Sequence, residues 1–74
     1  RTQKVHKMKI NLDTKSDILR IKFQEGEYEI SKEIDENIVV DMDKDNKIIA
    51  IEIINASEKI PNQNLKDITF GITE

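Results

Sequence analysis

The sequence contains no cysteine and no tryptophan, and only two glycines and one proline occur among its 74 residues. Without cysteine, the chain can form neither disulfide bonds nor thiolate zinc sites. No apolar run approaches the roughly 20 residues of a membrane-spanning helix, and no charged-then-apolar signal segment opens the chain. These absences predict a small soluble protein, cytoplasmic by default, with no membrane partner.

Aromatic residues are also scarce, and the 15 acidic residues outnumber the 12 basic ones. The chain has three aromatic residues, a net charge of -3 and a pI near 5.1, whereas nucleic-acid binding favours a basic surface with stacking aromatics. His6 is the only histidine and lies in the expected N-terminal arm, residues 1–7, so we expect it to serve neither a catalytic triad nor a multi-histidine metal site. We therefore expect no nucleic-acid partner, no cofactor, no catalytic residues and no enzymatic activity.

Isoleucine is the commonest apolar residue, with 14 copies against two of alanine. Branching at Cβ costs side-chain freedom in a helix but packs well on a pleated sheet. Apolar residues alternate with polar ones in five runs, each bounded by turn-forming residues. The runs are Met8, Ile10, Leu12; Leu19, Ile21, Phe23; Tyr28, Ile30, Ile34; Ile38, Val40, Met42; and Ile49, Ile51, Ile53.

Joining consecutive runs by short hairpins keeps every apolar set on one side of the sheet. A four-residue turn at 24–27 sets Phe23 opposite Tyr28, and another at 43–46 sets Val40 opposite Ile49. The predicted fold is mainly β, a five-stranded antiparallel meander with one shared apolar face. A single layer leaves that face uncovered, so the sheet either curls strongly on itself or stacks on a second subunit.

The two ends of the chain read differently. Asn55 followed by Glu58 resembles a capping pair and predicts a short helical turn before Pro61. Residues 1–7 break the apolar phase and are expected to be a flexible arm or a segment foreign to the native chain, leaving 8–74 as one β-rich domain. Three apolar residues near the C-terminus alternate again and predict a sixth strand at the sheet edge: Ile68, Phe70 and Ile72.

Acidic residues between the fourth and fifth runs have the spacing of a calcium-binding EF-hand loop. Asp41, Asp43, Asp45 and Glu52 occupy positions 1, 3, 5 and 12 of such a loop. Asn46 stands where the sharp turn needs glycine, and both flanks read as strands rather than helices. The favoured interpretation is a polar hairpin turn, and a weak calcium-binding module remains the alternative function.

Apolar residues on the predicted solvent face of the fourth and fifth strands indicate a contact surface. These four residues are Val39, Ile48, Ala50 and Ile54. Strands that face solvent usually avoid such a patch, so the tail helix, a second copy or another protein should cover it. We predict a non-enzymatic interaction module, most simply a homodimer, with a heterologous protein partner as the other option.

Several segments also share their order and composition with a known family. They are Met8-Lys9-Ile10, the acid pair Asp13 and Asp17, the stretch 34–37, and Asp41 to Asn46 leading into Ile51 to Ser57. In these the chain resembles domain of unknown function 2283, a family of short prokaryotic proteins. It departs from the pattern at Arg20, where the family often has Tyr, and at Asn37 and Asn46, where Gly is common. The resemblance implies a compact fold and no chemistry, and leaves open a role as a partner protein, for example a toxin-neutralising subunit.

Overall fold

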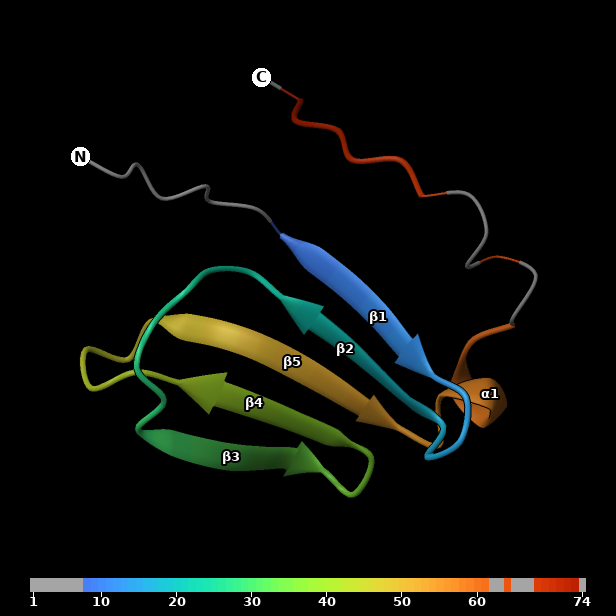
Figure 1. Ribbon diagram of the computed structural model, residues 1–74, viewed down its shortest axis with the longest axis horizontal. Coiled ribbons are helices and arrows are strands. Elements are labelled where there is room, and N and C mark those ends of the chain that lie inside the picture. Colours follow the sequence, from blue (N-terminus) through green and yellow to red (C-terminus); the bar gives the residue numbers. More distant parts are fainter. Residues whose placement is uncertain (1–7, 62–63, 65–67, 74) are drawn as a thin grey trace.

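The computed structural model describes residues 8–61, 64 and 68–73. Its elements are β1 (Lys9–Asp13), β2 (Ile18–Lys22), β3 (Ile30–Asp35), β4 (Ile38–Met42), β5 (Ile48–Ile54) and α1 (Ala56–Lys59). The five strands form one antiparallel sheet, and α1 lies beyond one end of it, near the β1–β2 turn (Figure 1). The predicted antiparallel five-stranded sheet and short helix are thus confirmed, but the sheet is not closed. The predicted arm, residues 1–7, lies outside the described residues.

The strand order is β1-β2-β5-β4-β3, which differs from the consecutive order of a meander. The predicted hairpin between the second and third strands is wrong, because β2 pairs with β5 rather than with β3. Strands β3, β4 and β5 are joined by hairpins, and β2 lies beside β5, so these four strands form a Greek key. Strand β1 extends it at one margin, and β3 forms the other margin (Figure 1).

Composition explains why β5 occupies the middle of the sheet. Five of its seven residues are isoleucine, and a central strand buries more apolar area than an edge strand. Strand β3 carries Lys32, Glu33 and Asp35, all exposed, and charged side chains suit an edge strand. Both preferences disfavour the consecutive strand order of a meander, in which β3 would be a central strand and β5 an edge strand.

The loop at residues 23–29 makes this order possible by crossing the ends of β5 and β4. Strands β2 and β3 stand about 14 Å apart at the usual strand spacing, a distance that seven residues can span. The Phe23 N–H donates to the carbonyl of Ile49 at 2.7 Å, and the Glu29 N–H donates to that of Met42 at 2.9 Å. The loop is therefore anchored to both strands that it crosses.

The pairing of side chains agrees with the predicted faces. In the first hairpin the predicted register is confirmed, with Ile10 opposite Ile21 and Leu12 opposite Leu19. In the hairpin of β4 and β5, Val40 lies opposite Ile51 rather than Ile49, and the register shifts between Asp41 and Met42. A shift of two residues preserves the side to which each side chain points, so Ile51 and Ile53 remain on the predicted apolar side. The irregularity places Ile48 opposite Met42, and so on this side, whereas the sequence predicts Ile48 on the other.

The helix is capped differently from the prediction. Asn55 takes a left-handed conformation (φ 58°) and its side chain makes no capping hydrogen bond. Asp17 supplies the cap from the β1–β2 turn: its carboxylate accepts the Ser57 N–H at 3.1 Å and the Ser57 hydroxyl at 2.7 Å. Its backbone carbonyl also accepts the Ala56 N–H at 2.9 Å. The turn and α1 are thereby joined across 40 residues of sequence.

Replacing Asp17 with alanine is expected to lower the free energy of unfolding by about 1–2 kcal/mol, because the helix loses its cap. Asp17 also has φ 60°, a conformation that alanine tolerates poorly. The variant D17N, in which asparagine keeps an acceptor oxygen and tolerates positive φ, should lose less than half as much. Urea denaturation of D17A and D17N measures both, and equal losses would show that the acceptor contributes nothing.

The predicted sixth strand is absent from residues 68–73, which have no regular structure. Ile68, Phe70 and Ile72 are all exposed there. A period-two pattern becomes a strand only when a neighbouring strand supplies hydrogen bonds. These residues run apart from the sheet (Figure 1), so the alternation has no such partner.

Candidate interaction surface

One side of the sheet is apolar across β1, β2, β5 and β4, and we call it the apolar face. Cross-strand pairs connect its members, with Ile51 of β5 lying opposite both Ile21 of β2 and Val40 of β4. Among its residues only Leu19 is buried, at 3% exposure, whereas Ile10 is 42% exposed and the others are half-buried. The apolar face consists of Ile10, Leu12, Leu19, Ile21, Ile38, Val40, Ile51 and Ile53.

The described part of the chain has a small core. Few of the described side chains are buried, and the buried apolar residues are Leu19, Met42, Ile49, Ala50 and Ala56.

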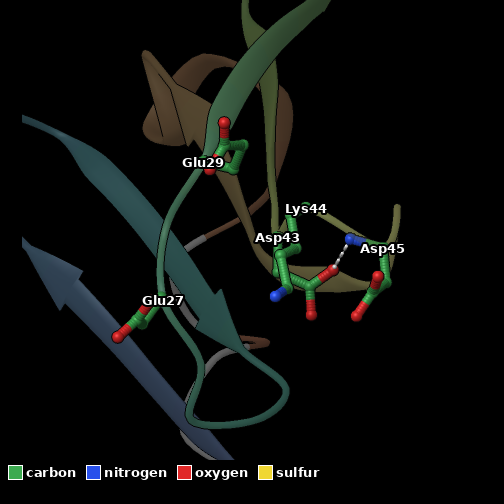
Figure 2. A pocket seen from close by; sticks show the side chains of 5 residues that line it. All are labelled: Glu27, Glu29, Asp43, Lys44 and Asp45. Carbon is green, nitrogen blue, oxygen red and sulfur yellow. Dashed lines mark hydrogen bonds between the residues drawn. The ribbon is translucent and has the colours of Figure 1, made fainter.

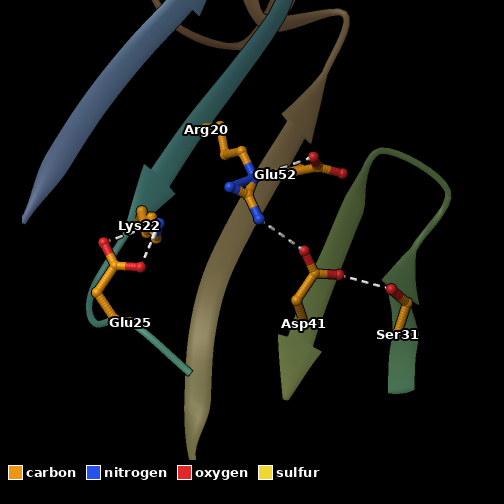
Figure 3. A network of polar contacts seen from close by, with 6 residues as sticks. All are labelled: Arg20, Lys22, Glu25, Ser31, Asp41 and Glu52. Atoms are coloured by element: carbon orange, nitrogen blue, oxygen red, sulfur yellow. Dashed lines mark hydrogen bonds and ion pairs between the residues drawn. The ribbon is translucent and has the colours of Figure 1, made fainter. Parts of the chain in front are cut away.

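The opposite side of the sheet carries a polar network that spans four strands (Figure 3). Arg20 of β2 reaches over β5, where its Nε lies 3.3 Å from Glu52 Oε2, and its Nη2 lies 3.2 Å from Asp41 Oδ2 on β4. Asp41 also accepts a hydrogen bond from the Ser31 hydroxyl of β3 at 2.5 Å. Asp41 is 9% exposed, so this pairing offsets much of the cost of burying its charge.

The polar network adjoins two residues of the contact patch that the sequence predicts. Glu52 lies directly opposite Val39, and Asp41 lies directly opposite Ala50. Ala50 has 0% exposure and contributes no surface, and Ile48, 44% exposed, lies opposite Met42 on the side of the apolar face. Val39 and Ile54 are half-buried, and Ile54 lies opposite Ile18. The structure therefore places the larger continuous apolar surface on the other side of the sheet.

The four acids with EF-hand spacing occupy two different places. Asp41 and Glu52 meet at Arg20 on the sheet, whereas Asp43 and Asp45 lie in the β4–β5 turn. Asp43 Oδ1 accepts the N–H groups of Asp45 at 2.8 Å and of Lys47 at 2.9 Å, as in a polar hairpin turn. Asn46 takes the left-handed conformation (φ 64°) that the turn requires. Within the described residues, no group of three or more acids or histidines is arranged to hold a metal ion.

Two shallow hollows lie outside the apolar face. The first, of about 220 Å³, is lined by acids and one lysine, and Glu27 and Glu29 point away from the carboxylates of Asp43 and Asp45 (Figure 2). The second, of about 180 Å³, lies beside Arg20 and Glu52. Both are smaller than the roughly 300–1,000 Å³ of typical small-molecule sites. Among the described residues, neither hollow is lined by a histidine or a cysteine.

Asp13 and Asp17, the acid pair in the β1–β2 turn, both act as backbone acceptors. Asp17 caps α1, and Asp13 Oδ1 accepts the N–H groups of Lys15 at 3.0 Å and of Ser16 at 3.3 Å. The backbone bonds from Ser16 and Lys15 hold the pKa of the Asp13 carboxyl below its ordinary value. The hydrogen bonds that Asp13 accepts in the turn and Asp17 accepts from α1 thus account for both acids.

We expect the Asp13 carboxyl carbon to titrate below the ordinary aspartate pKa when followed by NMR. Since its pKa is lower in the folded state, Asp13 stabilises the fold above the unfolded-state pKa, and this contribution is lost as the pH falls through the folded-state value. A titration midpoint at or above the ordinary value would show that the turn hydrogen bonds do not persist in solution.

The observations so far define a small open-sheet protein with one apolar and one polar face. No helix among its described residues is long and apolar enough to span a membrane. The family described as Protein of unknown function (DUF2283) matches residues 9–57, about two thirds of the chain, and the chain belongs to that family. No curated protein and no solved structure matches it. The matched segment runs from β1 to Ser57, so it ends at the residue that Asp17 caps.

Proposed function

We propose that this protein is a non-enzymatic interaction module that self-associates as a homodimer through its apolar face. The observation that carries the proposal is the open apolar face itself, where seven of the eight residues keep part of their surface accessible. A sheet with one apolar side is stable when a second layer covers that side. A second copy of the chain offers the same apolar face, as a two-fold interface requires.

Covering the accessible apolar side chains of this face favours a dimer, because burying apolar surface gains about 25 cal/mol per Å². This gain opposes the translational and rotational entropy lost on association. Lys32 lies at the margin of this side, opposite Val40, where its amine can stay in water.

Other occupants of the apolar face are outcomes of the same test. A different cytoplasmic protein, such as a toxin that this chain neutralises, would leave the isolated chain monomeric and bind through the same residues. Calcium binding has less support, because Asp41 and Glu52 are paired with Arg20, and Asp43 Oδ1 is bonded to two backbone N–H groups.

Light scattering behind a sizing column tests the proposal directly. We expect the mass of a dimer, twice 8.6 kDa, across the micromolar range, with dissociation on dilution. A monomer that persists at millimolar concentration would contradict the homodimer. Repeating the measurement over a series of sodium chloride concentrations distinguishes apolar packing from ion pairing in the dimer. Apolar packing depends weakly on salt, whereas surface ion pairs are screened.

A further inference from the structure

One edge of the sheet offers backbone hydrogen-bonding groups to a partner. Strand β1 pairs with β2 on one side and with no other described strand on the other, and four of its five residues are exposed. It forms a margin of the sheet in Figure 1. Unpaired edges of this kind readily add a strand from another chain.

We propose that β1 pairs antiparallel with β1 of a second copy about a two-fold axis at Asn11. The sequence of β1 is Lys-Ile-Asn-Leu-Asp, which is self-complementary in this register. Lys9 comes to lie opposite the partner subunit's Asp13, and Ile10 opposite the partner subunit's Leu12. Each dimer gains two opposite-charge pairs and two apolar pairs besides the backbone hydrogen bonds.

The other edge does not have this property. The two antiparallel self-pairings of β3 that align most of the strand are centred on Lys32 and on Glu33, and each places like charges directly opposite, which is destabilising. Strand β3 also has a register irregularity between Glu33 and Asp35, which blunts an edge. With one edge available, pairing ends at the dimer and does not continue into a fibre.

This inference rests on the proposed function and names the seam of the proposed dimer. The two-fold axis at Asn11 is perpendicular to the sheet, so the apolar faces of both copies lie on the same side of ten continuous strands. Open sheets of about ten strands tend to curl or to divide into two packed layers. Edge pairing and coverage of the apolar face are therefore compatible within one dimer.

A single introduced cysteine tests the seam, because the chain has none of its own. Opposite residues in antiparallel strands have Cα atoms about 4.5 or 5.5 Å apart, within the range of a disulfide. The variant N11C should therefore form a covalent dimer under air oxidation at least tenfold faster than E33C, the matched variant on β3. Asn11 lies on the side opposite the apolar face, so stacking through that face alone would keep the two thiols apart.

Charge reversal at the seam provides the second test. K9E places two acids opposite each other twice per dimer and should raise the dimer dissociation constant at least tenfold, whereas K32E on β3 should leave it unchanged. If the wild type is a dimer but N11C cross-links no faster than E33C and K9E matches K32E, the seam is wrong and the proposed function stands. A monomeric wild type overturns both.

Discussion

Replacing Ile51 with lysine is expected to convert the dimer into a folded monomer, with a dissociation constant at least a hundredfold higher. Ile51 lies at the centre of the apolar face, between Ile21 and Val40 on the neighbouring strands. In the dimer its ammonium group would be removed from water without an anionic partner, at a cost of several kcal/mol. In the monomer the half-buried position lets the long side chain reach solvent. Sedimentation velocity measures the change.

The matched control is V39K, which introduces the same side chain on the opposite side of the sheet, where Val39 lies opposite Glu52. Val39 is half-buried and belongs to the patch predicted from the sequence. The dimer should tolerate V39K with less than a threefold change in dissociation constant. If V39K dissociates the dimer and I51K does not, the contact surface is the sequence-predicted patch. Circular dichroism confirms that each variant is folded.

Replacing Leu19 with alanine is expected to lower the free energy of unfolding by about 2–5 kcal/mol, because it opens a cavity in a small core. Leu19 is 3% exposed and is one of five buried apolar residues on the described chain. A domain of this length has about 4–11 kcal/mol of stability, so the loss approaches a large share of the total. Urea denaturation at one fixed protein concentration measures it, since association also stabilises the fold.

The control for this variant is F70A, in the exposed C-terminal segment. Phe70 is 72% exposed and should change the free energy of unfolding by less than about 0.5 kcal/mol. If F70A destabilises the chain as much as L19A, the C-terminal segment packs on the sheet in solution. That result would also show that the segment covers part of the apolar face.

The strands and their two faces follow from the sequence because alternation is a local signal. Every strand lies close to its predicted position, and the first hairpin has its predicted register. The order of the strands does not follow from alternation, since a strand can pair with any other strand of suitable polarity. Here β5 displaces β3 from the side of β2, because a strand with five isoleucines gains more from a central position than a strand with three charges.

The polar network could not be predicted for the same reason. Arg20 and Asp41 are 21 residues apart, and they meet only because β5 brings β2 and β4 together. In a consecutive meander β3 would lie between β2 and β4, and β5 would be an edge. The contact between Asp17 and Ser57, 40 residues apart, depends on the same arrangement. Asp17 and Asp41 belong to acidic motifs that are visible in the sequence, but the residues that they contact depend on the strand order.

Intermolecular NOEs in a mixture of isotope-labelled and unlabelled chains test the central claim most directly, since they identify the residues that meet in the dimer. The account predicts NOEs between copies from the methyl groups of Ile21, Val40 and Ile51 on the apolar face. Intermolecular NOEs confined to Val39 and Ile54, or their complete absence at millimolar concentration, would contradict it.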